Sequence, residues 1–488
     1  AYADDLLVLI GGNNRDRLKE DVSSIFTDIN DWALANKLSI NKEKTRAIWL
    51  PGRDQGLLLR NVKLPEVKLE QHVKYLGITY SSDGTFKEHQ RRIDSKIRKL
   101  NNKIRSIRIG NRGLPGEKMR RIYKTVIEKI ISYGANTWTK ALGSVEKKKL
   151  NSLQRTMLLS VTEAYRTTST EAMQVIANIT PLDLILRAES KRADILECGG
   201  SATVSGRPIG ASGIEMRPHK FATHPKNWTR VGWAEWHDRD DYILQIYTDG
   251  SKTSDGTGAA FVVLDRGRQI FSAGFSLSKH HTHYQAEAVA ILKATMWFAE
   301  ECQGNKVAII SDSQSALKAL YRTQEVSPTI RDIKRTITTI KRQGRQIDLY
   351  WTKGHAGQAG NEMADRAAKE AVISGQRYVM PRPVSWVKAL IKKETLREWA
   401  TRWAGSDKGR HTHNIISAPG FKEWIFSKEI TQILTNHGRT PSYMHRFGLT
   451  SSPLCSCGGV GDWEHYFFFC RSTEAVAGVS ADYRTYNN

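Results

Sequence analysis

Four acidic residues between positions 243 and 375 have the type and placement that metal-dependent phosphodiester chemistry requires. Asp249 and Asp312 each follow directly on a short apolar run of the kind that forms strands. Glu287 lies near the start of a helical pattern, and Asp365 lies within a later one. Carboxylates brought to one point repel one another unless divalent cations neutralise them. Two Mg²⁺ ions about 3.5–4 Å apart would do so, one activating water and one stabilising the leaving oxygen of a phosphodiester.

Hydrophobic periodicity predicts the elements that position these carboxylates. The predicted strands are Ile243–Thr248, Gly258–Leu264, Gln269–Leu277, Lys306–Ser311 and Gln346–Trp351. The predicted helices are Tyr284–Glu301, Gln314–Tyr321, Thr329–Arg342 and Gly360–Ser374. This order predicts an α/β segment with five strands and flanking helices, in a multidomain chain of the α/β and α+β classes. Functional groups collect at the carboxyl ends of strands in such sheets, so neighbouring first and fourth strands would make the four carboxylates converge.

A histidine, His355, lies on a glycine-rich loop between the last strand and the last helix. A histidine there could shuttle a proton or help to eject a metal-bound product. The alternative for each acidic residue taken singly is a helix cap or a solvated loop charge. Four carboxylates in this order, together with that loop, favour a nuclease site.

The segment resembles a type 1 ribonuclease H domain, which cleaves the RNA strand of an RNA–DNA hybrid with Mg²⁺. The family's Asp-Glu-Asp-Asp order falls on Asp249, Glu287, Asp312 and Asp365, and its loop histidine on His355. The resemblance implies a five-stranded mixed sheet with flanking helices. It implies that these residues are catalytic and that the four carboxylates bind two Mg²⁺ ions. It also implies that Asn361 supports the site and that Ser251 and Gln285 lie near the hybrid.

The N-terminal edge, Tyr2-Ala3-Asp4-Asp5 before the apolar run Leu6–Ile10, resembles the catalytic turn of reverse transcriptases. We expect Leu6–Ile10 to be a buried strand and Asp4 and Asp5 to be metal ligands, with a surface turn as the alternative. Two later motifs resemble polymerase parts: Leu38–Thr45, in which Lys44 is a possible proton donor, and Val73–Ile78, a primer-grip strand pair. Polymerase chemistry also needs an earlier aspartate and nucleotide-holding fingers. Since the sequence starts at Ala1 without a methionine, we expect a fragment that is not competent as a polymerase.

Further motifs, Tyr133-Gly134-Ala135, Gln154-Arg155 and Ala164–Ser169, resemble the region after the polymerase in non-LTR retrotransposons of the R1, I and LOA kind. The resemblance covers nearly the whole chain. Six regions are expected: a truncated palm (1–84), a basic helical thumb-like region (85–198), a linker (199–241), the ribonuclease H domain (242–375), a helical region (376–452) and a zinc-binding tail (453–488). The linker is expected from composition, because residues 199–213 hold five glycines and three serines and too few apolar residues to pack.

The segment from Lys87 to Lys124 holds 14 basic residues and three acidic ones. Ile93, Ile97 and Ile104 recur at helical spacing, which predicts an amphipathic helix. Its basic residues include Arg91, Arg92, Lys96, Lys99 and Lys103. The alternative is a helix face that is only exposed to solvent. Such faces usually carry acidic and basic residues in similar numbers, whereas this one is almost entirely basic, so we expect contacts with nucleic-acid phosphates.

The tail supplies four potential zinc ligands, Cys455, Cys457, His465 and Cys470, spaced C-x-C-x7-H-x4-C. Zinc in structural sites takes a closed tetrahedron of sulfur and nitrogen donors. The single residue between the first two cysteines departs from the commoner spacing of two, and free buried cysteines are the alternative. The tail resembles the cysteine–histidine motif that ends many non-LTR polyproteins, which implies one structural Zn²⁺.

Composition agrees with a nucleic-acid partner. The 488 residues carry a formal charge of +24, and 40% of them are hydrophobic, enough to form cores. No apolar stretch approaches the length of a membrane span, and five cysteines indicate a reducing compartment. The family resemblance implies RNA–DNA hybrid, RNA and DNA as partners and a nuclear or cytoplasmic location. Trp228, Trp233 and Trp236 could stack on bases or pack an interdomain surface, and His280, His281 and His283 could hold a metal or face the hybrid.

Two rival functions remain open from the sequence. One is a catalytically dead nucleic-acid-binding relic of a retrotransposon, against which the intact carboxylates speak. The other is a transposase or integrase, which shares the sheet and acidic cluster but lacks the loop with Gly354-His355.

Overall fold

The computed structural model describes residues 4–12, 15–50, 67–109, 112–216, 229–237, 242–324, 327–354, 357–420 and 427–472. The chain forms two compact units. The first combines residues 1–190 with 395–488, and the second is residues 191–394. Among the described residues, no helix combines the length and the apolar character needed to cross a membrane.

The second unit is built on a seven-stranded mixed sheet with the order β10-β15-β14-β11-β12-β13-β16. Its strands are β10 (Trp233–Glu235), β11 (Leu244–Lys252), β12 (Thr257–Asp265), β13 (Arg268–Leu277), β14 (Lys306–Ser311), β15 (Gln346–Trp351) and β16 (Gln376–Arg377). The pairs β11–β12 and β12–β13 are antiparallel, and the other pairs are parallel. The five predicted strands are present, with β11 and β14 adjacent as expected. The short edge strands β10 and β16 were not predicted, since runs of two or three residues carry no periodicity.

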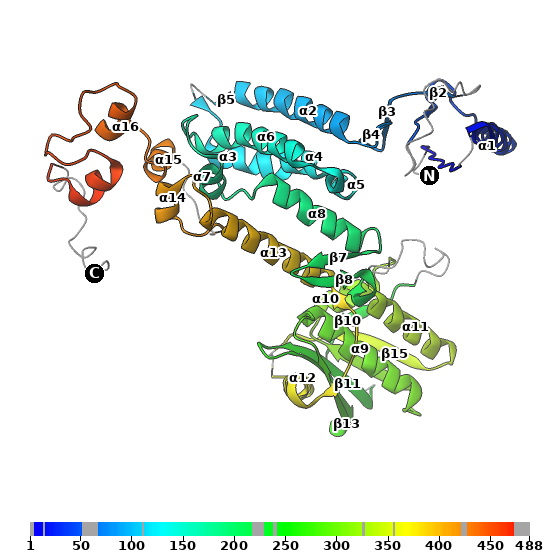
Figure 1. Ribbon diagram of the computed structural model, residues 1–488. Coiled ribbons are helices and arrows are strands. Elements are labelled where there is room, and N and C mark those ends of the chain that lie inside the picture. The colour runs from blue at the N-terminus through cyan, green and yellow to red at the C-terminus, as the bar shows by residue number, and fades with distance from the viewer. Residues whose placement is uncertain are drawn as a thin grey trace. The chain divides into compact units, whose positions relative to one another are not determined.

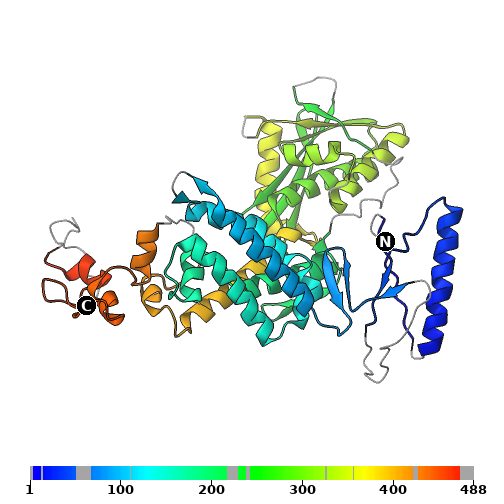
Figure 2. The same ribbon diagram turned by 90° about the horizontal axis from the view of Figure 1, so that it is seen from above.

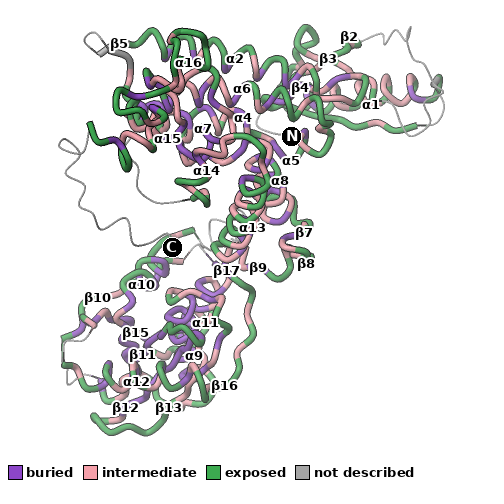
Figure 3. Tube along the Cα trace, turned by 60° about the vertical axis from the view of Figure 1, so that its left-hand side comes forward, coloured by how far each residue is buried: buried purple, intermediate pink, exposed green. Residues whose placement is uncertain are grey.

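Helices cover both faces of this sheet (Figures 1 and 2). They are α9 (His283–Glu300), α10 (Gln314–Tyr321), α11 (Pro328–Arg342) and α12 (Ala359–Ser374), close to the predicted bounds. The side chains of successive residues in each strand point to opposite faces of the sheet, because the backbone is pleated. Ile246 and Ile309 pack with the core of α9, α10 and α11, whereas Tyr247 and Ile310 pack with Ala364 of α12. Burial is accordingly concentrated on α9 and the central strands (Figure 3).

Glycines allow α12 to lie directly against the sheet. A Cβ on Gly258 of β12 would collide with the backbone carbonyl of Ala368, and one on Gly274 of β13 would lie 2.8 Å from Cβ of Ala371. On the helix side, positions 364, 368 and 371 are alanines, all buried, whose small side chains permit this close approach. Close backbone approach of this kind explains why glycine stands inside two strands.

Substituting Gly258 with alanine is therefore expected to destabilise the second unit by about 3 kcal/mol or more, because the helix must be displaced from the sheet. The denaturant midpoint of the full chain measures this. Gly232→Ala is the matched control, since no described atom outside its chain neighbours lies within 4 Å of a Cβ built there. Equal midpoints for the two variants would contradict this packing account.

The range predicted as a linker contains regular structure where it is described. β7 (Ser201–Val204) and β8 (Arg207–Gly210) form an antiparallel hairpin, and β9 (Ile214–Glu215) pairs in parallel with β17 (Arg382–Pro383). The expectation that glycine and serine prevent packing here was wrong for these residues. The Ser205-Gly206 turn, with both residues at positive φ, is what glycine-rich sequence supplies to a hairpin.

The first unit is mainly helical. Its helices between residues 85 and 190 are α2 (Lys87–Ser106), α3 (Gly116–Ile122), α4 (Glu128–Ser132), α5 (Ala135–Trp138), α6 (Ser144–Thr162), α7 (Thr170–Ile176) and the first part of α8 (Leu182–Leu196), with a π-helical turn at Tyr123–Ile127. α2 buries Ile93, Ile97 and Ile104 as predicted, in a core shared with α6. After it come α13 (Val384–Ala404), α14 (Arg410–Ile415), α15 (Lys428–Leu434), α16 (Pro441–Arg446) and a π-helical turn at His465–Phe469.

The N-terminal segment corrects one expectation. Leu6–Ile10 is not a strand, and Leu6, Leu7, Val8 and Leu9 are exposed. An apolar run becomes a buried strand only where a partner strand and a core receive it, and no named strand of the described residues pairs with it. The helix of this segment is α1 (Arg15–Ala35). The predicted strand pair is present as β3 (His72–Tyr75) and β4 (Ile78–Ser81), whereas β1 (Arg46–Ala47) and β2 (Lys68–Leu69) are two-residue strands.

Candidate active site and metal centres

Three carboxylates of the second unit meet at one place. Asp249 of β11, Glu287 of α9 and Asp312 after β14 each offer an oxygen, and these oxygens all lie within 4.8 Å of one another. Asp249 and Glu287 are buried, at 5% and 2% exposure, and Asp312 is half-buried. The predicted convergence of these three residues is therefore present in the fold.

Strand register and one glycine bring the three together. β11 and β14 run parallel with Thr248 opposite Ser311, so Asp249 and Asp312 occupy equivalent places on neighbouring strands. A Cβ on Gly250 would collide with the backbone nitrogen of Glu287, so glycine is what lets the start of α9 reach β11. Sequence reasoning assigned no role to Gly250, although a glycine inside a strand indicates close backbone approach.

The electrostatics of the cluster favour a bound cation. Burial, followed by the charges of Asp312 and Asp365, raises the pKa of Asp249 to about 7. Burial, followed by the charges of Asp249 and Asp312, raises the pKa of Glu287 well above its ordinary value. Glu287 Oε2 is buried without a hydrogen-bond partner among the described residues. Buried polar atoms are rarely left unpaired, and oxygen is the donor that Mg²⁺ prefers, so the cluster fits a divalent cation.

Asp365 of α12 joins this cluster electrostatically, since its charge contributes to the raised pKa of Asp249. Its carboxylate forms a 2.7 Å ion pair with Lys369, one helical turn later. On the other side, His283 Nε2 lies 3.2 Å from Glu287 Oε1, also at i,i+4 spacing. The pairing of Lys369 with Asp365 and that of His283 with Glu287 were not predicted. Both could have been predicted from the sequence, because charged residues four apart on a helix are neighbours.

The ion pair with Lys369 gives a testable consequence. Lys369→Ala is expected to tighten Mg²⁺ binding severalfold, because a cation that competes for Asp365 and repels the metal is removed. Isothermal titration of the metal-free protein measures the affinity. Lys388→Ala, an exposed lysine of α13, is the matched control. Unchanged or weaker Mg²⁺ binding in Lys369→Ala would show that Asp365 is not used by the metal.

The residues expected near the hybrid occupy different environments. Ser251 is buried on β11, two residues beyond Asp249 and hence on the same face of the strand. Gln285 closes a capping box with Thr282 at the start of α9, and its amide donates to Glu215 of β9. Asn361 is buried at the start of α12, and its Oδ1 has no hydrogen-bond partner in the described part of the chain.

His355 lies outside the described residues. Its neighbour Gly354 is described, and a Cβ there would lie 2.9 Å from Asp312 Oδ2, so this end of the loop lies against the carboxylates. The three histidines considered as a separate metal site have different neighbours. His283 faces Glu287, and the ring of His280 lies 5.5 Å from that of Trp386. Buried His281 lies 3.3 Å from the Met380 carbonyl oxygen.

A second cluster lies in the tail. Cys455, Cys457, His465 and Cys470 present sulfur and nitrogen atoms that all lie within 4.8 Å of one another. Cys455 Sγ is 3.8 Å from Cys470 Sγ, which is 3.9 Å from Cys457 Sγ. Two thiolates on one tetrahedral zinc at about 2.3 Å are separated by about 3.8 Å. The unusual C-x-C spacing therefore still permits a tetrahedral donor set.

Local structure shapes this second cluster. Gly458 turns the chain at φ +90°, and the Cys455 amide donates to the Gly459 carbonyl oxygen over 2.7 Å. A Cβ on Gly459 would lie 2.8 Å from Nδ1 of His465, so the histidine can approach only because this residue is glycine. The His465 amide is held by Asp462 Oδ1 at 2.8 Å.

The remaining predicted site residues are not part of either cluster. Asp4, Asp5 and Lys44 are exposed, and their side chains make no hydrogen bond or ion pair with another described residue. On α2, Arg91 and Arg92 both pair with Glu88, at 2.7 and 3.1 Å.

The other three basic residues predicted on α2 differ from these arginines. Lys96, Lys99 and Lys103 are exposed and unpaired within the described ranges. Of the tryptophans, Trp236 is buried against Tyr350 and Tyr242, Trp233 is half-buried, and Trp228 lies outside the described residues.

Comparison with known proteins agrees with this geometry. A model of the RNase H family matches residues 241–373. Ribonuclease H of Shewanella loihica is 30% identical over 156 aligned residues, which take in 28% of this chain and 91% of the Shewanella protein. The chain belongs to the ribonuclease H family. The resemblance predicted from the Asp-Glu-Asp-Asp order is thus confirmed.

The ribonuclease H domain belongs to a chain that is also similar to retrotransposon proteins. The Pol polyprotein of type-1 retrotransposable element R1 4 of Nasonia vitripennis is 26% identical over 234 residues, covering 43% of this chain and 59% of that protein. A putative 115 kDa protein of element R1DM of Drosophila melanogaster is 29% identical over 188 residues, covering 38% of this chain and 18% of that protein. These similarities place the chain with R1-like non-LTR retrotransposon polyproteins, and the chain spans less than two thirds of the length of these two relatives.

Proposed function

We propose that this chain is a Mg²⁺-dependent endonuclease that hydrolyses the RNA strand of RNA–DNA hybrids. The observation that carries the proposal is the convergence of Asp249, Glu287 and Asp312 within 4.8 Å, inside a domain matched to RNase H. Burial raises the pKa values of Asp249 and Glu287, and divalent cations would replace the protons that burial favours.

The chain's own residues have distinct roles in this proposal. Asp249 and Asp312, on neighbouring parallel strands, would bind both cations, while Glu287 and Asp365 would complete the two coordination shells. When bound, Mg²⁺ supplies water activation and charge stabilisation at the leaving oxygen. Ser251, Gln285 and Asn361 would contact the hybrid or support the site, and His355 would assist turnover.

A substrate panel tests the activity and separates it from its rivals. RNA–DNA hybrid, duplex RNA and duplex DNA of one sequence are incubated with the protein and Mg²⁺. We expect cutting of the hybrid alone. An integrase would nick duplex DNA and leave the hybrid intact. A binding relic would cleave none of the three substrates.

The other regions have supporting roles in the proposal. Residues 453–488 would hold one structural Zn²⁺ through the cysteine–histidine cluster. Residues 1–84 would correspond to part of a reverse transcriptase palm, to which Asp4, Asp5 and Lys44 would belong. Residues 85–198 would be the thumb-like region, whose α2 presents exposed Lys96, Lys99 and Lys103 to nucleic-acid phosphates.

A further inference from the structure

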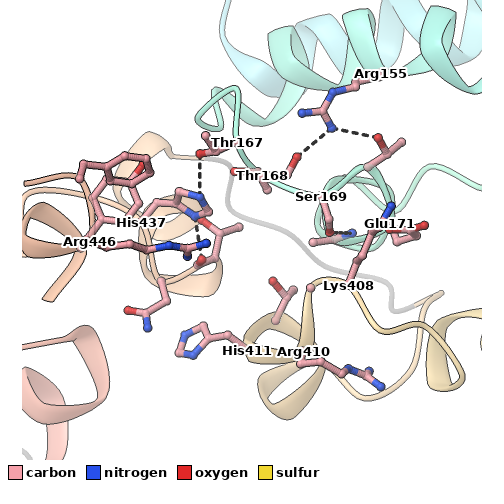
Figure 4. Close-up of a pocket in the computed structure, with 18 residues that line it drawn as sticks. Arg155, Thr167, Thr168, Ser169, Glu171, Lys408, Arg410, His411, His437 and Arg446 are labelled. Carbon is pink, nitrogen blue, oxygen red and sulfur yellow. Dashed lines mark hydrogen bonds between the residues drawn. The ribbon is translucent and has the colours of Figure 1, made fainter.

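A cavity of about 880 Å³ lies in the first unit, apart from both clusters described above. One wall is Arg155 with the loop and helix start at 167–172, and the other is formed by residues 408–412 and 435–447 (Figure 4). Its volume is in the range of pockets that hold a ligand the size of a nucleotide.

Two cations at this cavity are available to a ligand. The side chains of Lys408 and Arg446 are exposed and make no hydrogen bond or ion pair with the described residues. By contrast, Arg155 already makes hydrogen bonds within the cavity wall. It donates to the Thr168 carbonyl oxygen at 2.8 Å and to the Thr170 hydroxyl at 2.9 Å. Glu171 is the single acidic residue of the lining, so the cavity favours an anion.

Polar atoms of the lining are buried without partners. Thr168 Oγ1, Asn436 Oδ1 and Arg410 Nε lack hydrogen bonds to any residue that the structure describes. Thr168 is only 2% exposed, and Asn436 holds a left-handed backbone at φ +51°. Unpaired buried polar groups cost free energy, and two of these three atoms can donate to an oxyanion.

The walls are held in place before any ligand binds. His437 lies 2.7 Å from the Thr435 carbonyl oxygen through Nδ1 and 3.1 Å from the Thr167 hydroxyl through Nε2. Burial lowers the pKa of His437, with Arg446 and His411 adding to the effect, so the neutral ring donates from Nδ1 and accepts from Thr167. Figure 4 shows this bridge between the two walls, with Arg446 beside His437. A preorganised site loses less free energy on binding.

An aromatic surface lies beside the cations. Phe447 is 48% exposed, and its ring is 5.0 Å from that of Tyr443. Exposed aromatic rings next to unpaired cations are the combination that binds single-stranded nucleic acid, through base stacking and phosphate contacts.

We propose that this cavity is a second nucleic-acid site, which binds single-stranded RNA or DNA with a phosphate between Lys408 and Arg446, the Thr168 hydroxyl donating to it, and a base on Phe447. The proposal does not depend on the nuclease activity, because the carboxylates lie in the other unit.

Fluorescence anisotropy of labelled 20-nucleotide single-stranded RNA and DNA tests it on the full chain. The double variant Lys408→Ala with Arg446→Ala is expected to weaken binding about tenfold or more. Because one phosphate contact is lost, the plot of log affinity against log salt should become shallower by about 0.7. The control, Lys392→Ala with Lys393→Ala on α13, removes two exposed lysines elsewhere and should bind like wild type.

Thr168→Val separates binding from folding. Because the hydroxyl is buried and unpaired, its removal should leave the melting temperature unchanged or higher while weakening strand binding severalfold. Strand affinity unchanged in both the double variant and Thr168→Val would overturn the proposal. So would binding of inorganic phosphate or a mononucleotide at the cavity with no effect of these variants on strand affinity.

Discussion

Asp249→Asn is expected to lower the rate of hybrid cleavage about a thousandfold or more. The substitution keeps the shape of the side chain but removes a charge that neutralises the proposed metals. Metal-assisted stabilisation of a phosphodiester transition state contributes several kcal/mol, and each 1.36 kcal/mol is a factor of ten in rate. Single-turnover cleavage of a labelled hybrid at saturating protein measures the chemical step.

The control for this variant is Asp255→Asn, the same chemical change on an exposed turn six residues later. It should cleave at the wild-type rate. Asp249→Asn should also remain folded, since a neutral amide removes a buried charge and its repulsion with the neighbouring carboxylates, the two causes that raise the pKa values of Asp249 and Glu287. An Asp249→Asn protein that still cuts within tenfold of wild type would remove the carboxylate cluster from the mechanism.

The second large effect concerns the tail. Cys470→Ser, or a zinc chelator applied to wild type, is expected to unfold residues 453–472. Structural zinc supplies about 10–16 kcal/mol of apparent free energy in isolated zinc fingers, far more than the small buried core of this tail. Atomic absorption should find one zinc per chain in wild type and none in the variant, and limited proteolysis should cut the variant tail faster.

Cys198→Ser changes an exposed cysteine outside the cluster and should keep both the zinc and the protease resistance. A wild-type protein without zinc, whose tail resists protease as well as the metal-loaded form, would favour the alternative of free buried cysteines. The 3.8 and 3.9 Å sulfur separations would then reflect packing alone.

How much could be predicted from the sequence depended on whether a local signal existed. Most strands and helices around Asp249, Glu287 and Asp312 were placed to within one residue, because long buried strands and amphipathic helices carry strong periodicity. β11 was predicted to end at Thr248 but continues to Lys252, so Asp249 lies within the strand and does not follow it. The order of the strands was less accessible, and it was the assumed adjacency of the first and fourth strands that allowed the site to be anticipated.

The features that were missed are those set by tertiary packing. Leu6–Ile10 has the composition of a buried strand but is exposed, since composition does not supply a partner. The roles of Gly250 and Gly258 depend on how near a helix comes to the sheet, which no spacing reveals. Glu215, whose carboxylate accepts a hydrogen bond from the Gln285 amide, is 70 residues away in sequence. By contrast, the pairing of Lys369 with Asp365 and of His283 with Glu287 could have been predicted from their i,i+4 spacing on a helix.

The most direct test of the proposed function is strand-resolved cleavage of an RNA–DNA hybrid labelled on both strands, followed as Mg²⁺ is titrated into the metal-free wild-type protein. We predict that the RNA strand is cut, that the DNA strand stays intact, and that cutting is absent without metal. A folded protein that binds Mg²⁺ and leaves the RNA strand uncut would contradict the nuclease proposal and favour the binding relic.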